Sequence, residues 1–314
     1  MNGQPTLEDF FDAWELFRDP VLAAIFVGMT LGYLGVYIVL RRMVFVSAAL
    51  SQAAGFGVAF AFYAQIALGL TGVLASPVVG AFAFTALAML VLVRPGVERW
   101  VSRESLLGAV YLVGSAGALL VGTRIQQEAH DIQAILFGTA VLVRPEDLTS
   151  IEIFAAVILV RQLALGRGLR FASFDRDGAV IRGLPVRALD GALFTSIAIA
   201  VSVSTRVLGA LPVFAFSILP AIAGILLAPN VRLAMIIGAF LGALAGSAGY
   251  VVAFLYGWPV GASQAAVAAG IAALAGCIRL LLPKPRRLPT SRRSEEPAEM
   301  NRQDDKHAKI GAEI

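Results

Sequence analysis

Very few residues in the apolar stretches of this sequence could bind an ion or transfer a proton. The central part of every such stretch lacks Asp, Glu and His. Hydroxyl and amide groups remain: Ser47, Ser51 and Gln52 lie close together, and Pro220 interrupts a later stretch. These groups can hydrogen-bond a polar solute or a neighbouring helix, whereas an intramembrane proton relay needs ionisable side chains. The pattern argues against a proton-coupled transporter, a pump and a channel with a charged ring.

The sequence also lacks residues for ATP hydrolysis. The lysines, Lys284, Lys306 and Lys309, lie near the C-terminal end, and none belongs to a phosphate-binding Gly-x-x-x-x-Gly-Lys loop. A single cysteine, Cys277, excludes an intrachain disulfide. We expect no enzyme activity, no cofactor and no nucleic-acid partner. Any ATPase must be a separate protein.

One charged segment offers metal-binding side chains outside the apolar stretches. Glu128, His130 and Asp131 cluster there and could bind a metal ion transiently. A loop that faces water is the commoner explanation for such a cluster. We therefore assign no metal ligands from the sequence.

The composition predicts an all-α, polytopic membrane protein. Of 314 residues, 58% are hydrophobic and 15% are charged, against about 25% charged in a soluble domain. A helix needs about 20 apolar residues to cross the hydrocarbon core. Charge-free runs predict nine spans, at residues 20–40, two within 43–93, 105–123, 148–165, 190–206, 207–231 and two within 233–278.

The positions of arginine and lysine predict the orientation. With nine spans, one set of alternate loops carries sixteen of these residues and the other carries four. Because cytoplasmic loops are rich in Lys and Arg, we expect the N-terminus outside and the C-terminus inside. Residues 1–19 then form an extracytoplasmic segment with an amphipathic helix from Glu8 to Phe17. Residues 20–283 form the membrane domain, with a cytoplasmic loop at about 166–190, and residues 284–314 form a disordered cytoplasmic tail.

The cytoplasmic loop contains signals for a short helix. Asp175 can accept hydrogen bonds from backbone N–H groups at the start of such a helix. Gly183 can end it in a left-handed conformation, and Pro185 prevents its continuation. The helix either shields the end of the bundle or is presented to a cytosolic partner.

Four segments in order resemble the zinc/manganese-type ABC permeases, the membrane subunits of metal-ion importers. The loop from Phe174 to Val186 is similar to their FDPEFARALGLPV loop. The others are Gly32 to Met43, which ends in their RRM motif, residues 131–138, similar to DLxxxLFG, and residues 216–221, similar to LLILPAA. Together the segments cover roughly residues 20–283.

The resemblance implies partners and roles. Two permease copies, or a copy and a relative, would form a pathway in the inner or plasma membrane of a prokaryote. An extracytoplasmic binding protein would deliver the substrate. A cytosolic ATPase would dock on the short helix, with coupling residues Phe174, Asp175, Arg182, Gly183 and Leu184.

The chain departs from the family at two positions. After RRM the family carries Asp and, four residues later, His, whereas Ala48 and Gln52 stand here. Neither is a good ligand for zinc or manganese. Ser47, Ser51, Gln52 and Pro220 are candidates to line the pathway, although Gln52 could equally bond a neighbouring helix. The expected substrate is a divalent metal ion, the alternative is a metal chelate or other small solute, and a membrane scaffold without transport is a further alternative.

Overall fold

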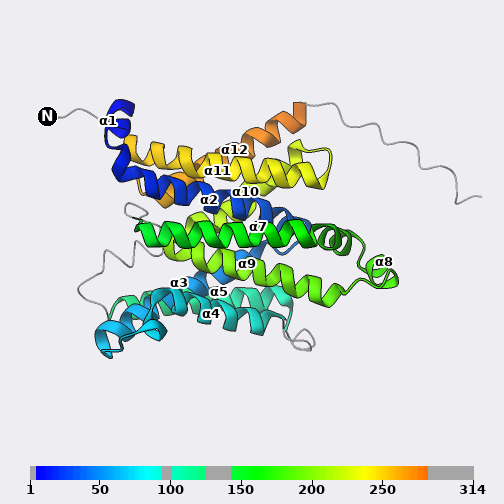
Figure 1. Ribbon diagram of the computed structural model, residues 1–314, viewed down its shortest axis with the longest axis horizontal. Coiled ribbons are helices and arrows are strands. Elements are labelled where there is room, and N and C mark those ends of the chain that lie inside the picture. Colours follow the sequence, from blue (N-terminus) through cyan, green and yellow to red (C-terminus); the bar gives the residue numbers. More distant parts are fainter. Residues whose placement is uncertain (1–4, 94–100, 125–142, 282–314) are drawn as a thin grey trace, which may run out of the picture. The chain divides into compact units, whose positions relative to one another are not determined.

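The computed structural model describes residues 5–93, 101–124 and 143–281 (Figure 1). Regular structure in these ranges is entirely helical, and the chain up to Arg279 forms one compact unit. The helices are α1 (Leu7–Asp12), α2 (Trp14–Leu40), α3 (Val44–Ala67), η1 (Val73–Ala75), α4 (Pro77–Val93), α5 (Arg103–Gly122), α7 (Pro145–Phe174), α8 (Arg176–Ile181), α9 (Val186–Leu208), α10 (Ala210–Leu227), α11 (Val231–Tyr256) and α12 (Val260–Leu281).

Each of the nine predicted spans coincides with an apolar helix. Within the described ranges, eight helices are long and apolar enough to cross a membrane, and α4 is a shorter apolar helix. The turn predicted between α3 and α4 is present, with Gly69 and Gly72 at φ of 63° and 108°. The break predicted between α11 and α12 lies at Gly257, with φ of 64°. The expected all-α, multi-pass fold is confirmed.

Several predicted helix ends are wrong. α2 begins at Trp14 rather than at residue 20, α7 continues to Phe174 rather than ending near Leu165, and α9 begins at Val186 rather than near Asp190. In each case a charged residue was taken as a boundary. Charged side chains can reach water from a continuous helix, and the backbone keeps its hydrogen bonds. The predicted cytoplasmic loop therefore consists largely of helix.

The expected amphipathic helix from Glu8 to Phe17 is two helices that meet at Ala13. α1 is held by a capping box, in which Thr6 and Asp9 bond each other's backbone N–H groups. Phe10 is buried and packs on Phe17 of α2 and Phe254 of α11, with ring centroids 5.3 Å away in both cases. This aromatic contact attaches the N-terminal segment to the bundle.

α2 packs against its neighbours through glycine. It contacts α10 and α11 most extensively and also touches α7 and α9. At Gly28 and Gly242 the backbones of α2 and α11 approach so closely that a Cβ on either residue would overlap the other's carbonyl group. Gly32 and Gly238 repeat the contact one turn further along. Small residues bring helices together in this way when lipid, and not water, surrounds them.

The contact between α2 and α11 generates a stability prediction. Gly28→Ala should destabilise the fold by about 1–3 kcal/mol, because the added methyl group must push the two backbones apart. The measurement is the thermal unfolding midpoint of the purified protein in detergent. Gly270→Ala in α12 is the matched control, since no atom lies within 4 Å of its added Cβ. A midpoint equal for both variants would contradict the prediction.

Candidate functional site

Two buried serines join α3 to α10 inside the bundle. The hydroxyl oxygens of Ser47 and Ser217 lie 2.8 Å apart, and both side chains are fully buried. Each hydroxyl also lies near a carbonyl of its own helix, those of Val44 and Phe214. Pro220 is buried one turn further along α10, where it cannot donate a backbone hydrogen bond. The predicted pathway residue Ser47 thus contacts the motif that contains Pro220 through Ser217, which was not among the predicted residues.

Ser51 and Gln52 do not join this serine pair by hydrogen bonds. The Ser51 hydroxyl donates to the carbonyl of Ala48 at 2.9 Å, within α3. Gln52 is five residues from Ser47, which places it about 140° around the helix. Its backbone lies against Gly114 of α5, where an added Cβ would be 2.7 Å from the Gln52 carbonyl carbon. Its side-chain oxygen is buried and has no hydrogen-bond partner among the described residues.

Neutral groups dominate the interior. The buried polar residues of the described ranges are Ser, Thr and Gln. No group of three or more His, Cys, Asp or Glu side chains suited to a metal ion occurs in the same ranges. The segment with Glu128, His130 and Asp131, the motif at 131–138 and the predicted tail lie outside the described residues. A bare divalent cation is poorly matched to the described interior, because it prefers carboxylate or imidazole ligands.

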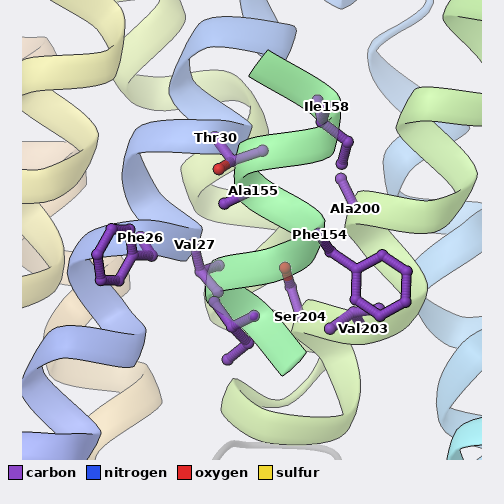
Figure 2. Close-up of a pocket in the computed structure, with 10 residues that line it drawn as sticks. Phe26, Val27, Thr30, Phe154, Ala155, Ile158, Ala200, Val203 and Ser204 are labelled. Atoms are coloured by element: carbon purple, nitrogen blue, oxygen red, sulfur yellow. The ribbon is translucent and has the colours of Figure 1, made fainter. Parts of the chain in front are cut away.

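A small pocket between α2, α7 and α9 has the same neutral character. Figure 2 shows side chains of Phe26, Val27 and Phe154 around it, with Thr30 and Ser204 as the polar members. No ionisable side chain lines it. We interpret it as a gap in helix packing.

An ion pair joins α7 and α9 at the end of the bundle that the topology places outside. Arg206, in the last turn of α9, lies 2.6 Å from Asp147, in the first turn of α7. Arg144 approaches the other carboxylate oxygen at 3.3 Å. These positions suit the helix dipoles, which favour an acid at a helix start and a base at a helix end. Asp147 and Arg206 are 59 residues apart, and nothing in the sequence pairs them.

The predicted short helix is α8, and its caps are confirmed. The Asp175 carboxylate accepts a 2.8 Å hydrogen bond from the Gly178 backbone N–H. A Cβ on Gly178 would overlap that carboxylate. Gly183 adopts φ of 73°, and Leu184 donates its backbone N–H to the Ala179 carbonyl at 3.0 Å. These bonds form a Schellman motif, which stops the helix after one and a half turns.

α8 exposes an apolar surface. Ala179 is buried against the bundle, whereas the side chains of Phe174, Val180 and Ile181 are 60%, 60% and 86% exposed. The Arg182 guanidinium lies 4.8 Å from the centre of the Phe171 ring, within cation–π range. Leu184 is half-buried. The coupling residues expected from the sequence are thus gathered around α8 (Figure 1).

Asp190 fixes α8 to the bundle. Its carboxylate lies 2.6 Å from Arg41, at the end of α2, and 2.8 Å from Arg176, at the start of α8. Arg41 also donates to the Ser173 hydroxyl at 2.9 Å. The Arg41 and Asp190 side chains are 11% and 13% exposed. In the sequence, Arg41 stands out only as part of the RRM motif, and nothing there pairs it with Asp190.

The sequence profile of the ABC 3 transport family matches residues 13–279. The manganese transport system membrane protein MntC of Halalkalibacterium halodurans is 26% identical, over 85% of this chain and 89% of its own length. The manganese import system permease protein ScaB of Streptococcus pneumoniae is 26% identical, over 81% and 88%. A solved chain from PsaBC of S. pneumoniae in complex with Fab has a similar fold, with a TM-score of 0.75 and 24% identity over 86% and 95%.

The Asp190 contact generates a second stability prediction. Asp190→Asn should cost about 3 kcal/mol, because Arg41 would keep a nearly buried charge without its partner. Thermal unfolding in detergent, combined with limited proteolysis at α8, measures the loss. Asp177→Asn is the matched control, because Asp177 is exposed on α8 and pairs with no arginine of the described ranges. Equal stability of the two variants would show that Asp190 does not hold α8.

Proposed function

The chain belongs to the ABC 3 transport family, and from that premise we propose that it is the membrane permease of an ATP-driven importer of a divalent metal ion. The geometry of α8 carries this proposal. A helix of one and a half turns gains little stability from its own hydrogen bonds, yet both of its ends are capped and Asp190 anchors it. Its exposed apolar residues suit a protein partner.

The partner that fits α8 is a cytosolic ATPase subunit. The orientation expected from arginine and lysine puts α8 in the cytoplasm. The chain itself has no phosphate-binding loop sequence, so the energy must come from another subunit. Residues Phe174, Asp175, Arg182, Gly183 and Leu184 would form the coupling contact, either directly or by holding α8 in shape.

The serine pair supports a pathway beside α3 and α10. Buried hydroxyl groups and Pro220 within α10 lie in this part of the described core, and helices that contain proline often flank transporter sites. A second permease copy or a related permease would complete the pathway. An extracytoplasmic binding protein would deliver the substrate at the end where Asp147 pairs with Arg206. Both partners follow from the family and are parts of this proposal.

Metal import is supported by the similarity to MntC, a manganese transport system membrane protein, and to ScaB, a manganese import permease. The neutral interior favours a second candidate, the import of a metal chelate or another small solute. A ligand shell around the metal would replace the carboxylates that Ala48 and Gln52 do not supply. The two candidates can be distinguished by measuring the metal content of cells with and without the protein in a medium without chelators. If the protein imports bare ions, its deletion should lower cellular manganese or zinc. If it imports a chelate or another solute, deletion should leave both unchanged.

Changes at α8 should uncouple the permease from its ATPase. Asp175→Ala combined with Arg182→Ala removes the helix cap and the stacking on Phe171, and we expect about tenfold weaker ATPase binding. Copurification and transport in proteoliposomes measure the effect. Glu15→Ala with Arg18→Ala is the control. It also removes one acidic and one basic side chain, but from exposed positions at the start of α2, far from α8 in the sequence. Full copurification and transport by the α8 variant would refute the assignment.

Restoring the family's ligands should create a metal site. Ala48 and Gln52 are four residues apart on α3 and so lie on one helix face. The double variant Ala48→Asp with Gln52→His should bind zinc or manganese, measured by calorimetry in detergent, at least about tenfold more tightly than the wild type. Gln52→His alone is the control with one added ligand. Tight stoichiometric binding by the wild type that Gln52→Ala abolishes would show that a site already exists.

A further inference from the structure

A basic cleft opens between α2, α7 and α11, at the end of the molecule that carries α8. Its cavity of about 330 Å³ is lined by Arg167 and Arg170 of α7, Arg232 of α11, Tyr33 of α2 and the buried Gln162. The same three arginines line a second cavity of about 310 Å³, together with Phe171 and Phe174. We call the two cavities together the basic cleft. Neither the transport proposal nor the serine pair uses the three arginines, Tyr33 or Gln162.

The arginines of the basic cleft have no acidic partner in the part of the chain that the structure describes. Three arginines elsewhere in the bundle differ: Arg41 and Arg176 pair with Asp190, and Arg206 pairs with Asp147. Three guanidinium groups around one space repel one another, and the start of α11 adds the positive end of a helix dipole. A bound anion would relieve this repulsion, and guanidinium groups favour phosphate.

Gln162 indicates that the ligand carries a hydroxyl group as well as a charge. Its side chain is 1% exposed and its nitrogen lies 3.4 Å from the Ser196 hydroxyl. Its carbonyl oxygen has no hydrogen-bond partner among the described residues. Such an oxygen costs free energy unless a donor reaches it. A hydroxyl group on a ligand in the cleft would supply that donor.

The rim of the basic cleft is apolar where it meets the outside of the bundle. Leu163 on α7 and Ile236 on α11 border the cavity, and their side chains are 70% and 62% exposed. A soluble anion would gain nothing from these side chains, whereas lipid acyl chains would cover them. Basic pockets between helices on the cytoplasmic side are suited to lipid headgroups.

We propose that the basic cleft binds the phosphodiester headgroup of an anionic, hydroxyl-bearing phospholipid of the cytoplasmic leaflet, with its acyl chains along Leu163 and Ile236. The arginines would contact the phosphate, and Gln162 would accept from the headgroup hydroxyl. The second cavity reaches Phe174, directly before α8. A bound lipid would therefore stand beside the helix assigned to the ATPase contact. The proposal needs membrane placement but no particular transport substrate.

The test uses the full-length permease, delipidated in detergent, and measures lipid binding by native mass spectrometry and by the shift in the unfolding midpoint. The probes are phosphatidylglycerol, phosphatidylcholine and inorganic phosphate. Arg167→Gln with Arg232→Gln should weaken phosphatidylglycerol binding at least about tenfold. Arg42→Gln with Arg187→Gln is the control, because it removes two exposed arginines outside the cleft and should leave binding unchanged.

A second variant keeps the charges in place. Gln162→Leu should weaken the binding of phosphatidylglycerol severalfold. The binding of phosphatidic acid, which lacks the headgroup glycerol hydroxyl, should not change. This difference remains informative if the double arginine variant does not fold.

Three results would overturn the proposal. The first is equal binding of phosphatidylglycerol and phosphatidylcholine, and the second is an equal loss of binding in the cleft and control pairs. The third is the same stabilisation by millimolar inorganic phosphate alone.

Discussion

The approach of α2 to α11 is the constraint on which the bundle depends. Inside a bilayer, lipid tails solvate apolar side chains as well as other helices do, so close packing must hold the helices together. Gly28 and Gly32 let the two backbones touch, and α10 and α7 then pack around the same helix. The end of α2 places Arg41 where it meets Asp190. The position of α8 therefore follows from packing deep in the membrane.

The polar contacts of the molecule are of two kinds, neutral hydrogen bonds in the interior and ion pairs near the helix ends. In the described interior, some hydroxyl groups bond each other and their own helix, as Ser47 and Ser217 do, whereas the amide oxygens of Gln52 and Gln162 have no partner among the described residues. Ion pairs lie near the helix ends, where Asp147 and Asp190 each bind two arginines. Arg161, in the middle of α7, instead donates to the neutral Ser196 hydroxyl of α9. This division follows the cost of moving a charge away from water. The buried polar residues of the described interior are therefore neutral, and the ion pairs are concentrated toward the helix ends.

The sequence predicted local features well. Charge-free runs located the apolar helices, because length and hydrophobicity decide membrane insertion. Asp175 and Gly183 predicted the ends of α8, because capping depends on residues only a few positions apart. The contacts between distant segments were not predictable. Ser217 is 170 residues from Ser47, and Asp190 is 149 residues from Arg41. Nothing in a single sequence pairs such residues. Charged residues were mistaken for helix ends for another reason, because their side chains can reach water from within a continuous helix.

The length of α7 has a mechanical consequence. Its thirty residues form a rod of about 45 Å, longer than the hydrocarbon core is thick. One end holds Asp147 against Arg206, and the other leads directly into α8. A tilt of about 5° around the middle of such a rod would move each end by about 2 Å in opposite directions. That displacement would be enough to break a hydrogen bond, so a movement of α8 in the cytoplasm would act as a lever on the ion pair at the far surface.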